Sequence, residues 1–296
     1  MHIEVQPSHT YDVSRYNILK TSLLKTLLEG ANDVIIKKNH AVYFRNVSKI
    51  YNTGTVALNH FDFPVEEGEF ISFLGPSGCG KSTALRMVAG LGTPTSGEVT
   101  VYGEPPEELI KNTNDIAFVF QDANLLPWRS VLDNVLLPLE LRGGNKKENK
   151  QAAISVLEMV GLKDHLTSYP RQLSGGMKMR VSIARALAAR PKLLLMDEPF
   201  AALDEITRQT LQMELLDIWK KEKMTVLFVT HNVYEAVFLS SKIAVMSARP
   251  GRLSSVIDVN LPYPRELGMR THPAFSDYVD RASASLENDE KRKETV

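Results

Sequence analysis

Cysteine is almost absent from this chain. Its 296 residues include one cysteine, Cys79, so no disulfide can form within the chain. Disulfide frameworks are typical of secreted proteins, and a single thiol favours a reducing compartment instead. The first ten residues are polar and lack a basic segment followed by an apolar one, so we expect no secretory signal there.

Long apolar runs and an excess of either charge are also missing. No stretch of about 18 consecutive apolar residues occurs, which is the length that a membrane-spanning helix needs. Lysine and arginine total 35, and aspartate and glutamate also total 35. Proteins that hold DNA or RNA along a surface usually carry a basic excess. We therefore expect no nucleic-acid partner, and any work at a membrane would be that of a peripheral subunit.

The residues that are present predict an α/β fold. Short apolar runs alternate with helical patterns, which favours one large domain with a mainly parallel sheet covered by helices on both faces. The predicted strands are 41–47, 56–65, 69–74, 116–120, 193–196, 225–229 and 242–246, and the predicted helices are 81–89, 147–160, 175–189, 205–221 and 233–240.

Two terminal segments lie outside this alternation. In residues 1–38, Leu19, Leu23 and Leu27 recur every four residues, which predicts an amphipathic helix. That helix would pack on its own domain or, alternatively, dock to a partner or a membrane surface. Residues 266–296 are set apart as a C-terminal tail, because prolines interrupt the chain there and its charged end is expected to fray.

A glycine-rich loop follows the predicted strand 69–74 and leads into the predicted helix 81–89. Its pattern of glycine, four residues, then glycine, lysine and serine is typical of nucleoside triphosphate sites. The glycines let backbone N–H groups converge on anionic oxygens, and the helix adds the positive end of its dipole. We expect Lys81 to reach the β- and γ-phosphates of ATP and Ser82 to coordinate Mg²⁺. The loop comprises Gly75, Pro76, Ser77, Gly78, Cys79, Gly80, Lys81, Ser82 and Thr83.

Cys79 lies inside this loop, and two interpretations of it are open. A helix N-terminus lowers the pKa of a thiol, which would make Cys79 sensitive to oxidation. The simpler interpretation is that a small residue fits the turn.

Two carboxylates follow the apolar run 193–196. Asp197, at the end of this predicted strand, suits the Mg²⁺-holding role found in phosphate-loop ATPases. Glu198 would point to the opposite side if the strand continues, where it would polarise the attacking water as a general base. The alternative is a pair of solvated acids that begin a turn before Pro199. The phosphate loop upstream favours the catalytic interpretation.

Two further motifs complete an ordered set. Leu-Ser-Gly-Gly-Met at 173–177 precedes the acidic pair, and Thr230-His231 follows it. Over about residues 41 to 260 this order resembles the ATP-binding subunits of ABC transporters. The resemblance implies a P-loop NTPase core with an N-terminal antiparallel β subdomain and a helical signature subdomain at about 122–190. It places the ATPase domain at 39–265.

The resemblance also implies roles for single residues. Tyr51 corresponds to the aromatic residue that stacks on adenine, although a tyrosine packed in a sheet is an alternative. Gln121 corresponds to the glutamine that contacts Mg²⁺ and the attacking water, and residues 122–134 would then face a membrane subunit. His231 corresponds to the switch histidine at the γ-phosphate. Residues 201–204 correspond to the D-loop, although Ala201 replaces a frequent serine.

The signature motif implies that ATP is shared between subunits. Ser174, Gly175 and Gly176 offer a hydroxyl and backbone N–H groups at a helix N-terminus, and Met177 stands where many relatives have glutamine. In this family such groups serve the ATP of the partner subunit. We therefore expect a second ATPase subunit, identical or similar, placed head to tail. Multi-span permease subunits would hold the pair at the cytoplasmic face of the inner membrane.

Details of the sequence are similar to one branch of the family, the ATPases of bacterial nitrate, sulfonate, taurine and bicarbonate importers. They are QDANLLPW at 121–128, EAVFLS at 235–240 and SARPGR at 247–252. A substrate-binding protein would then deliver the solute.

Two other functions are weighed against this one. A soluble ABC ATPase acting on ribosomes or nucleic acid usually has two cassettes or a long coiled coil, and this chain has one cassette and no sustained heptads. A module that binds ATP without hydrolysing it is at odds with Glu198 and His231.

Overall fold

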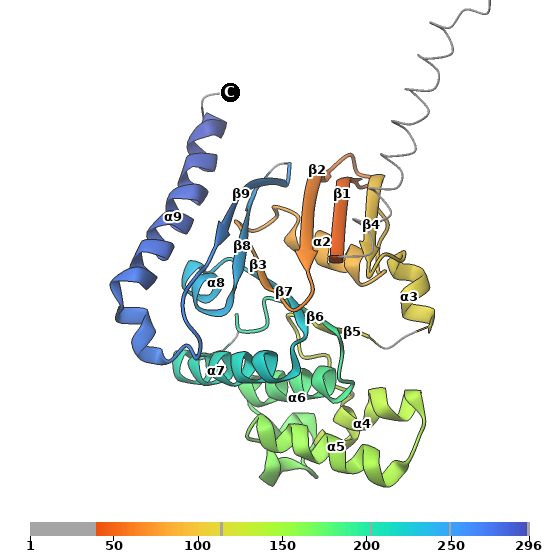
Figure 1. Ribbon diagram of the computed structural model, residues 1–296. Coiled ribbons are helices and arrows are strands. Elements are labelled where there is room, and N and C mark those ends of the chain that lie inside the picture. The colour runs from red at the N-terminus through yellow and green to blue at the C-terminus, as the bar shows by residue number, and fades with distance from the viewer. Residues whose placement is uncertain (1–39, 113–114, 202, 249, 295–296) are drawn as a thin grey trace, which may run out of the picture.

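The computed structural model describes residues 40–112, 115–201, 203–248 and 250–294 (Figure 1). The helix expected around residues 19–27 lies outside the described residues, as do Ala202 of the expected D-loop and Arg249. Within the described ranges, every helix is too short or too polar to cross a bilayer.

A six-stranded sheet forms the centre of the molecule, in the order β5-β6-β7-β3-β8-β9. The first five of these strands run parallel, and β9 runs antiparallel beside β8. Leu194 and Met196 of β6 are buried on one face, and Leu193 and Leu195 on the other. Burial on both faces explains why these strands are continuous apolar runs. The strands are β3 (Phe70–Leu74), β5 (Ile116–Val119), β6 (Leu193–Asp197), β7 (Thr225–Thr230), β8 (Lys242–Ser247) and β9 (Arg252–Asp258).

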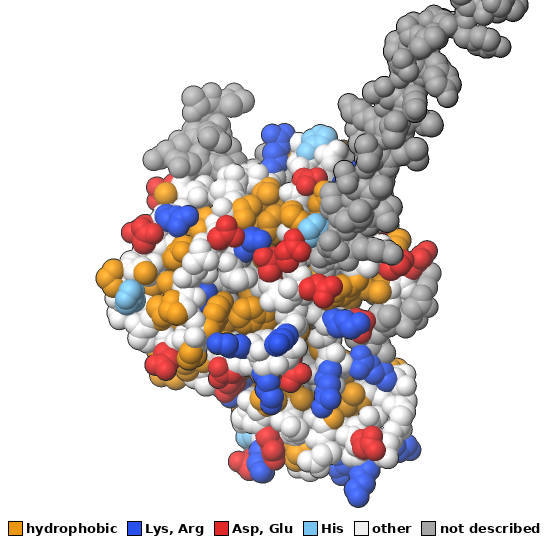
Figure 2. Space-filling model, viewed as in Figure 1, with side chains coloured by type: hydrophobic (Ala, Val, Ile, Leu, Met, Phe, Trp, Pro, Cys, Tyr) orange, Lys and Arg blue, Asp and Glu red, His pale blue; other side chains and the backbone are white. Residues whose placement is uncertain are grey.

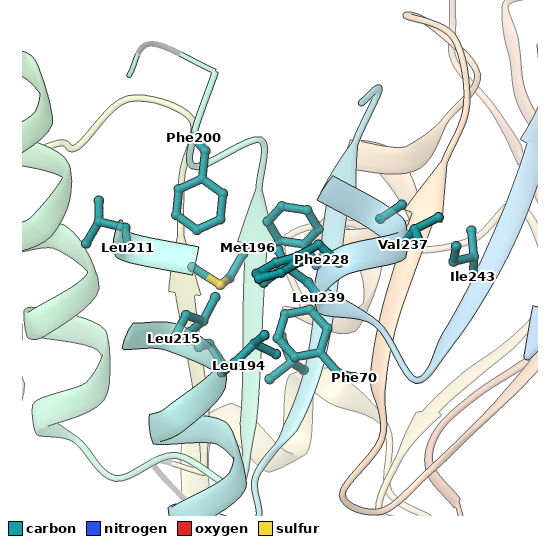
Figure 3. Close-up of a cluster of buried hydrophobic side chains, with 14 of the residues drawn as sticks. Phe70, Leu194, Met196, Phe200, Leu211, Leu215, Phe228, Val237, Leu239 and Ile243 are labelled. Atoms are coloured by element: carbon teal, nitrogen blue, oxygen red, sulfur yellow. The ribbon is translucent and has the colours of Figure 1, made fainter. Parts of the chain in front are cut away.

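The two faces of this sheet are covered differently. On one face Phe70 and Phe228 pack with Phe200 and with Leu211 and Leu215 (Figure 3). The helices on this side are α7 (Glu205–Glu222), α8 (Val233–Leu239) and α9 (Pro273–Glu294). The other face is covered by α2 (Lys81–Val88) and by an antiparallel sheet ordered β2-β1-β4. Its strands are β1 (His40–Ile50), β2 (Val56–Glu66) and β4 (Ser96–Val101).

A helical lobe projects from the core and has a small core of its own (Figures 1 and 2). It contains α4 (Val131–Arg142), α5 (Lys146–Met159) and the turns η1 (Lys163–His165) and η2 (Pro170–Gln172). The helix α6 (Gly175–Ala188) joins lobe and core, because Val181 and Ala184 face the lobe while Met179 and Ile183 face the sheet. On the face drawn in Figure 2, Lys and Arg side chains are interspersed with Asp and Glu.

The predicted fold class is confirmed, including the mainly parallel sheet, the antiparallel subdomain and the helical lobe. The C-terminal segment differs from the expected tail. After the turn η3 (Leu267–Thr271), α9 runs to Glu294 and buries Phe275, Val279 and Ala282 against the core. Their spacing of four and three residues is helical, but the charged residues around them made this pattern hard to recognise in the sequence. The elements β4, α3 (Pro106–Asn112), α4 and β9 were not predicted either.

Candidate functional site

The phosphate loop runs from the end of β3 to the start of α2, as the sequence predicts. Gly80 has φ +91°, and a Cβ on it would lie 2.5 Å from the carbonyl oxygen of Ala57, so only glycine fits there. No side chain caps the N-terminus of α2. The first N–H groups of this helix are therefore available to an anionic ligand.

Lys81 is held inside the loop. Its side chain is 4% exposed, and its ammonium nitrogen donates to the carbonyl oxygens of Gly75 at 2.7 Å and Pro76 at 3.0 Å. The Cys79 sulfur lies 3.8 Å from the same nitrogen. Burial raises the pKa of the Cys79 thiol, and the charge of Lys81 only partly opposes this. A raised thiol pKa favours the small-residue interpretation over the redox one.

Ser82 and Asp197 come together from α2 and the end of β6. The Ser82 hydroxyl donates to Asp197 Oδ1 at 2.8 Å, and Asp197 is 7% exposed. Burial raises the pKa of this carboxyl, while the Ser82 hydrogen bond lowers it and the neighbouring Glu198 raises it. Two hard oxygen donors beside a phosphate loop fit Mg²⁺, which binds through one or two carboxylates together with substrate phosphates. Among the described residues, no group of three or more His, Cys, Asp and Glu side chains forms another metal cluster.

Glu198 takes its position from a turn rather than from the strand. The strand does not continue to Glu198, because β6 ends at Asp197 and Glu198 adopts the left-handed conformation with φ 46°. Its N–H donates to the carbonyl oxygen of Val229 at 3.0 Å, which ties the turn to β7. A left-handed non-glycine residue at such a position costs free energy that the surrounding contacts must offset.

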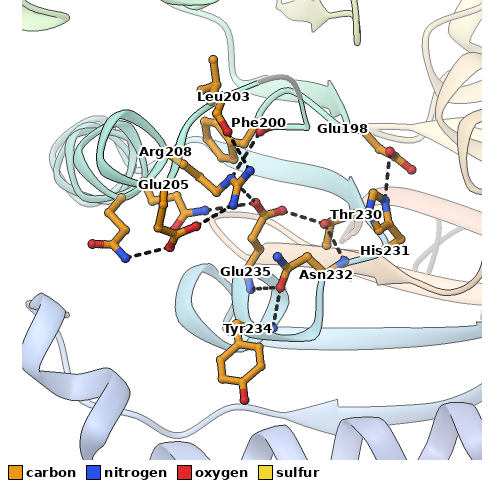
Figure 4. A network of polar contacts seen from close by, with 12 residues as sticks. Glu198, Phe200, Leu203, Glu205, Arg208, Thr230, His231, Asn232, Tyr234 and Glu235 are labelled. Carbon is orange, nitrogen blue, oxygen red and sulfur yellow. Dashed lines mark hydrogen bonds and ion pairs between the residues drawn. The ribbon is translucent and has the colours of Figure 1, made fainter. Parts of the chain in front are cut away.

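His231 follows β7 and meets Glu198 across the sheet edge (Figure 4). Its Nδ1 lies 3.0 Å from Glu198 Oε2. The Glu198 side chain is 18% exposed and that of His231 is 56% exposed. A carboxylate that accepts from an imidazole, beside a phosphate loop, is a suitable geometry for orienting a water molecule.

Lys81, Ser82 and Glu198 line one open cleft of about 840 Å³, together with Tyr51 and Gln121. Asp197 and His231 adjoin it through their contacts with Ser82 and Glu198. Tyr51 lies just past β1, is 42% exposed, and its hydroxyl lies 3.2 Å from Thr83 Oγ1. It is therefore not packed inside a sheet, which was the alternative interpretation. Gln121 follows β5 and is exposed to the cleft. The predicted loop residues Ser77, Gly78, Gly80, Lys81, Ser82 and Thr83 line the same cleft.

The signature residues lie elsewhere in the chain. Ser174 caps α6 by accepting from the Met177 N–H at 3.3 Å, and Gly175 and Gly176 follow it. They line a second pocket with Leu203, Asp204 and Thr207. This pocket and the phosphate-loop cleft share no lining residue among those that the structure describes. One copy of the chain therefore does not bring the two motifs together.

Gly251 is a residue of the site that sequence reasoning missed. It lies between β8 and β9, where its N–H donates to the Ala57 carbonyl at 3.2 Å and its carbonyl accepts from the Asn59 N–H at 2.9 Å. A Cβ on Gly251 would lie 2.2 Å from the carbonyl oxygen of Cys79. The β8–β9 turn therefore packs against the phosphate loop at Cys79 and braces it. Gly251 belongs to the SARPGR motif at 247–252, but nothing in the sequence indicates that it lies against the phosphate loop.

Comparisons with known proteins agree with this geometry. A family model described as ABC transporter matches residues 58–201. An uncharacterized ABC transporter ATP-binding protein of Methanocaldococcus jannaschii is 49% identical over 236 residues, which cover 79% of this chain and 86% of that protein. An aliphatic sulfonates import ATP-binding protein of Bacillus cereus is 43% identical over 227 residues, which cover 76% of this chain and 88% of that protein.

Solved structures are similar over about three quarters of the chain. A dimeric ATP-binding cassette in a post-hydrolysis state, bound to ADP and Pi, is 36% identical with a TM-score of 0.68. The match covers 75% of this chain and all of that one, 100%. The cbiO1 protein of Clostridium perfringens, described as part of an ABC transporter complex, has a TM-score of 0.68 at 26% identity. That match covers 74% of this chain and 89% of cbiO1.

Proposed function

This chain belongs to the ABC transporter family of ATP-binding subunits, and from that premise we propose that it powers the import of a small sulfonate or a related anion. Its enzymatic activity is ATP hydrolysis. The observation that supports the catalytic assignment is that three groups of residues meet at or directly beside one cleft. Lys81 and Ser82 begin α2, Asp197 ends β6, and Glu198 pairs with His231 at 3.0 Å.

Each of these residues has a separate task in hydrolysis. Lys81 and the N–H groups of α2 hold the phosphates, and Tyr51 stacks on the adenine. Glu198 orients and polarises the attacking water, and His231 stabilises charge that develops on the γ-phosphate. Ser82 and Asp197, with Gln121, would hold Mg²⁺, which neutralises charge on the β- and γ-phosphates when bound.

The site is completed by a second copy of the chain. Ser174 accepts from the Met177 N–H, so its own hydroxyl hydrogen remains for a phosphate oxygen. Gly175 and Gly176 add N–H groups at the same helix terminus. Because each copy carries both half-sites, two copies related by a twofold axis would form two complete sites. The similar cassette solved with ADP and Pi is described as dimeric.

A surface on the helical lobe would contact the permease. Trp128 is 72% exposed in the segment 122–134. Asn134 holds this segment in place, because it is fully buried and forms hydrogen bonds with both the N–H and the carbonyl of Leu126. An exposed tryptophan on a rigid loop is typical of a binding anchor. Contact at this surface would place the chain at the cytoplasmic face of the membrane as a peripheral subunit.

The solute class rests on relatives named for aliphatic sulfonate import, at 43% and 44% identity. The ATPase does not touch the solute, so the association comes through the permease and its substrate-binding protein. Deleting the gene should abolish uptake of alkanesulfonates or taurine, and a plasmid copy should restore it. Unchanged uptake of sulfonate, taurine, nitrate and bicarbonate would contradict the anion assignment.

A purification in detergent tests the transporter partner separately. We expect a multi-span membrane protein to copurify with the wild-type chain, and the Trp128→Ala variant to lose it while retaining ATP binding. Sedimentation with ribosomes in place of membranes would support the alternative of a soluble ABC ATPase.

A further inference from the structure

Glu235 is a buried carboxylate that lies outside both clefts. It belongs to α8 and is 6% exposed. Its Oε2 accepts from the Thr230 hydroxyl at 2.7 Å. Its Oε1 accepts from the Gln212 amide at 3.3 Å and lies 3.5 Å from Arg208 Nε (Figure 4).

On one side, this carboxylate fixes the backbone around His231. Thr230 directly precedes His231, and its Oγ1 also accepts from the Asn232 N–H at 3.0 Å. Asn232 in turn caps α8, where its Oδ1 accepts from the N–H of Tyr234 at 2.9 Å and of Glu235 at 3.3 Å. Both neighbours of His231 are therefore tied to one small network. The imidazole itself stays exposed and turned to Glu198.

On the other side, the same carboxylate reaches the expected D-loop through Arg208. The guanidinium donates to the carbonyl oxygens of Leu203 at 2.8 Å and Phe200 at 3.4 Å. It also pairs with Glu205 at 2.6 Å. Leu203 lines the pocket of the signature residues, with Asp204 and Thr207. Arg208 therefore connects Glu235 to the half-site that would hold a second subunit's ATP.

Stability alone does not account for this arrangement. Burial raises the pKa of the Glu235 carboxyl, and the Thr230 hydrogen bond and the charges of Arg208, His231 and Arg270 only partly offset it. A buried ion pair is on average no more stabilising than apolar groups of the same volume. Asn232 already caps α8, so the helix does not need Glu235 for that purpose.

We propose that Glu235 is a positioning residue that couples the two half-sites of one chain, by fixing His231 relative to Phe200 and Leu203. Contact of a second subunit near Leu203 then sets the position of His231 at the chain's own ATP. The inference rests on the proposed role of His231 at the γ-phosphate. It predicts loss of turnover and of cooperativity, with little loss of ATP affinity.

The Glu235→Gln variant tests this directly, because glutamine keeps the volume and one acceptor but removes the charge. We expect kcat to fall on the order of tenfold to a hundredfold, the cost of a small misplacement of a reacting group. KM for MgATP should stay within about twofold, and the dependence of rate on ATP concentration should lose its sigmoidal shape.

Glu214→Gln is the matched control. Glu214 is on α7, its pKa is likewise raised by burial, and it lies outside this network. Its kcat should equal that of the wild type. Equal kcat in Glu235→Gln and Glu214→Gln would overturn the proposal.

A double-mutant cycle separates positioning from a merely structural effect. If Glu235 acts through His231, Glu235→Gln should cost nothing further in a His231→Ala background. A full additional loss in that background would contradict the coupling. If His231→Ala alone leaves kcat unchanged, the proposed role of the histidine fails. If His231→Ala lowers kcat and Glu235→Gln does not, the positioning role fails alone.

A second pair of variants covers the case in which Glu235→Gln does not fold. Thr230→Ser keeps the hydroxyl that Glu235 accepts, and Thr230→Val keeps the shape without it. We expect the serine variant to retain the wild-type kcat and the valine variant to show the loss expected for Glu235→Gln. Equal kcat in the two variants would overturn the proposal.

Discussion

The phosphate-loop cleft and the signature pocket are both built at the N-terminus of a helix, yet they offer an anion different groups. In the cleft, α2 begins after Gly80 without a side-chain cap, and Lys81 and Glu198 supply charged side chains. In the pocket, α6 is capped by Ser174, which leaves one hydroxyl hydrogen and the N–H groups of two glycines. The phosphate-loop cleft has groups suited to binding ATP and activating water, whereas the Ser174, Gly175 and Gly176 groups of the signature pocket are suited to binding a phosphate alone.

This difference explains why one chain carries both. Two copies of the phosphate-loop cleft would provide two bases and two lysines but nothing to close over the γ-phosphate. In the proposed dimer, the signature pocket of the opposite subunit would close the site with the Ser174 hydroxyl and the N–H groups of Gly175 and Gly176. Under this proposal hydrolysis depends on assembly, because the pocket and the cleft share no lining residue among those that the structure describes. The predictions below change one region while leaving the other intact.

The largest effect is expected at Glu198. The Glu198→Gln variant removes the carboxylate that we propose acts as the base, but keeps the side-chain volume and the phosphate loop. We expect kcat for ATP hydrolysis to fall by about 10² to 10⁴, the usual contribution of a general base. ATP should still bind, so nucleotide-dependent dimers should persist in gel filtration. A normal hydrolysis rate in this variant would remove Glu198 as the base.

Ser82→Ala removes one of the two paired oxygen groups that we propose hold Mg²⁺, and leaves Asp197 in place. The Mg²⁺ concentration that gives half-maximal hydrolysis should rise about tenfold, as is usual when a metal site loses one of its supporting contacts. Ser276→Ala on exposed α9 is the control and should show the wild-type Mg²⁺ dependence. Identical Mg²⁺ titrations for the two variants would show that Ser82 holds no metal.

Gly251→Ala tests the brace behind the phosphate loop. The added Cβ would meet the Cys79 carbonyl at 2.2 Å, so either the loop or the β8–β9 turn must shift. We expect a loss of about 1–3 kcal/mol in the free energy of unfolding, typical of overpacking, and a raised KM for ATP. Gly268→Ala has nothing within 4 Å of the new Cβ and should match the wild type. A KM unchanged in both variants would mean that the turn does not support the loop.

The smallest effect concerns the stability of the cleft. Burial raises the pKa of Asp197, so the native state binds more protons than the unfolded state between the two pKa values. The stability contribution of this group is thus present below the unfolded pKa and is lost as the pH rises through the folded pKa. Asp197→Asn stays neutral. It should match the wild type in mild acid and exceed its free energy of unfolding at neutral pH, although it is inactive. Urea titrations without nucleotide over this pH range measure the difference, and parallel pH curves would contradict the interpretation.

The sequence predicted those parts of the molecule that depend on short stretches of chain. The strands of the parallel sheet are apolar runs bounded by turns, and the phosphate loop is a contiguous motif in a strand–loop–helix context. The boundary of β6 was less accessible. The strand ends at Asp197 because Glu198 adopts the left-handed conformation, which no local pattern records.

Contacts between distant segments account for what was missed. Gly251 braces the loop at Cys79, and Arg208 of α7 meets Glu235 of α8, yet each of these residues has an ordinary local context. The buried face of α9 is made of Phe275, Val279 and Ala282, which are few and separated by polar residues. Such features follow from the packing of the finished fold rather than from propensity.

Mixing two inactive variants tests the account of two complementary half-sites most directly. Lys81→Ala disables the cleft and spares the pocket, and Ser174→Ala disables the pocket and spares the cleft, so each variant alone should hydrolyse ATP poorly. A mixed dimer would contain one site with both halves intact and one with both halves disabled. We predict that ATPase activity appears when the two purified variants are combined and allowed to exchange subunits. A mixture that exchanges subunits but stays as inactive as its components would contradict the shared site.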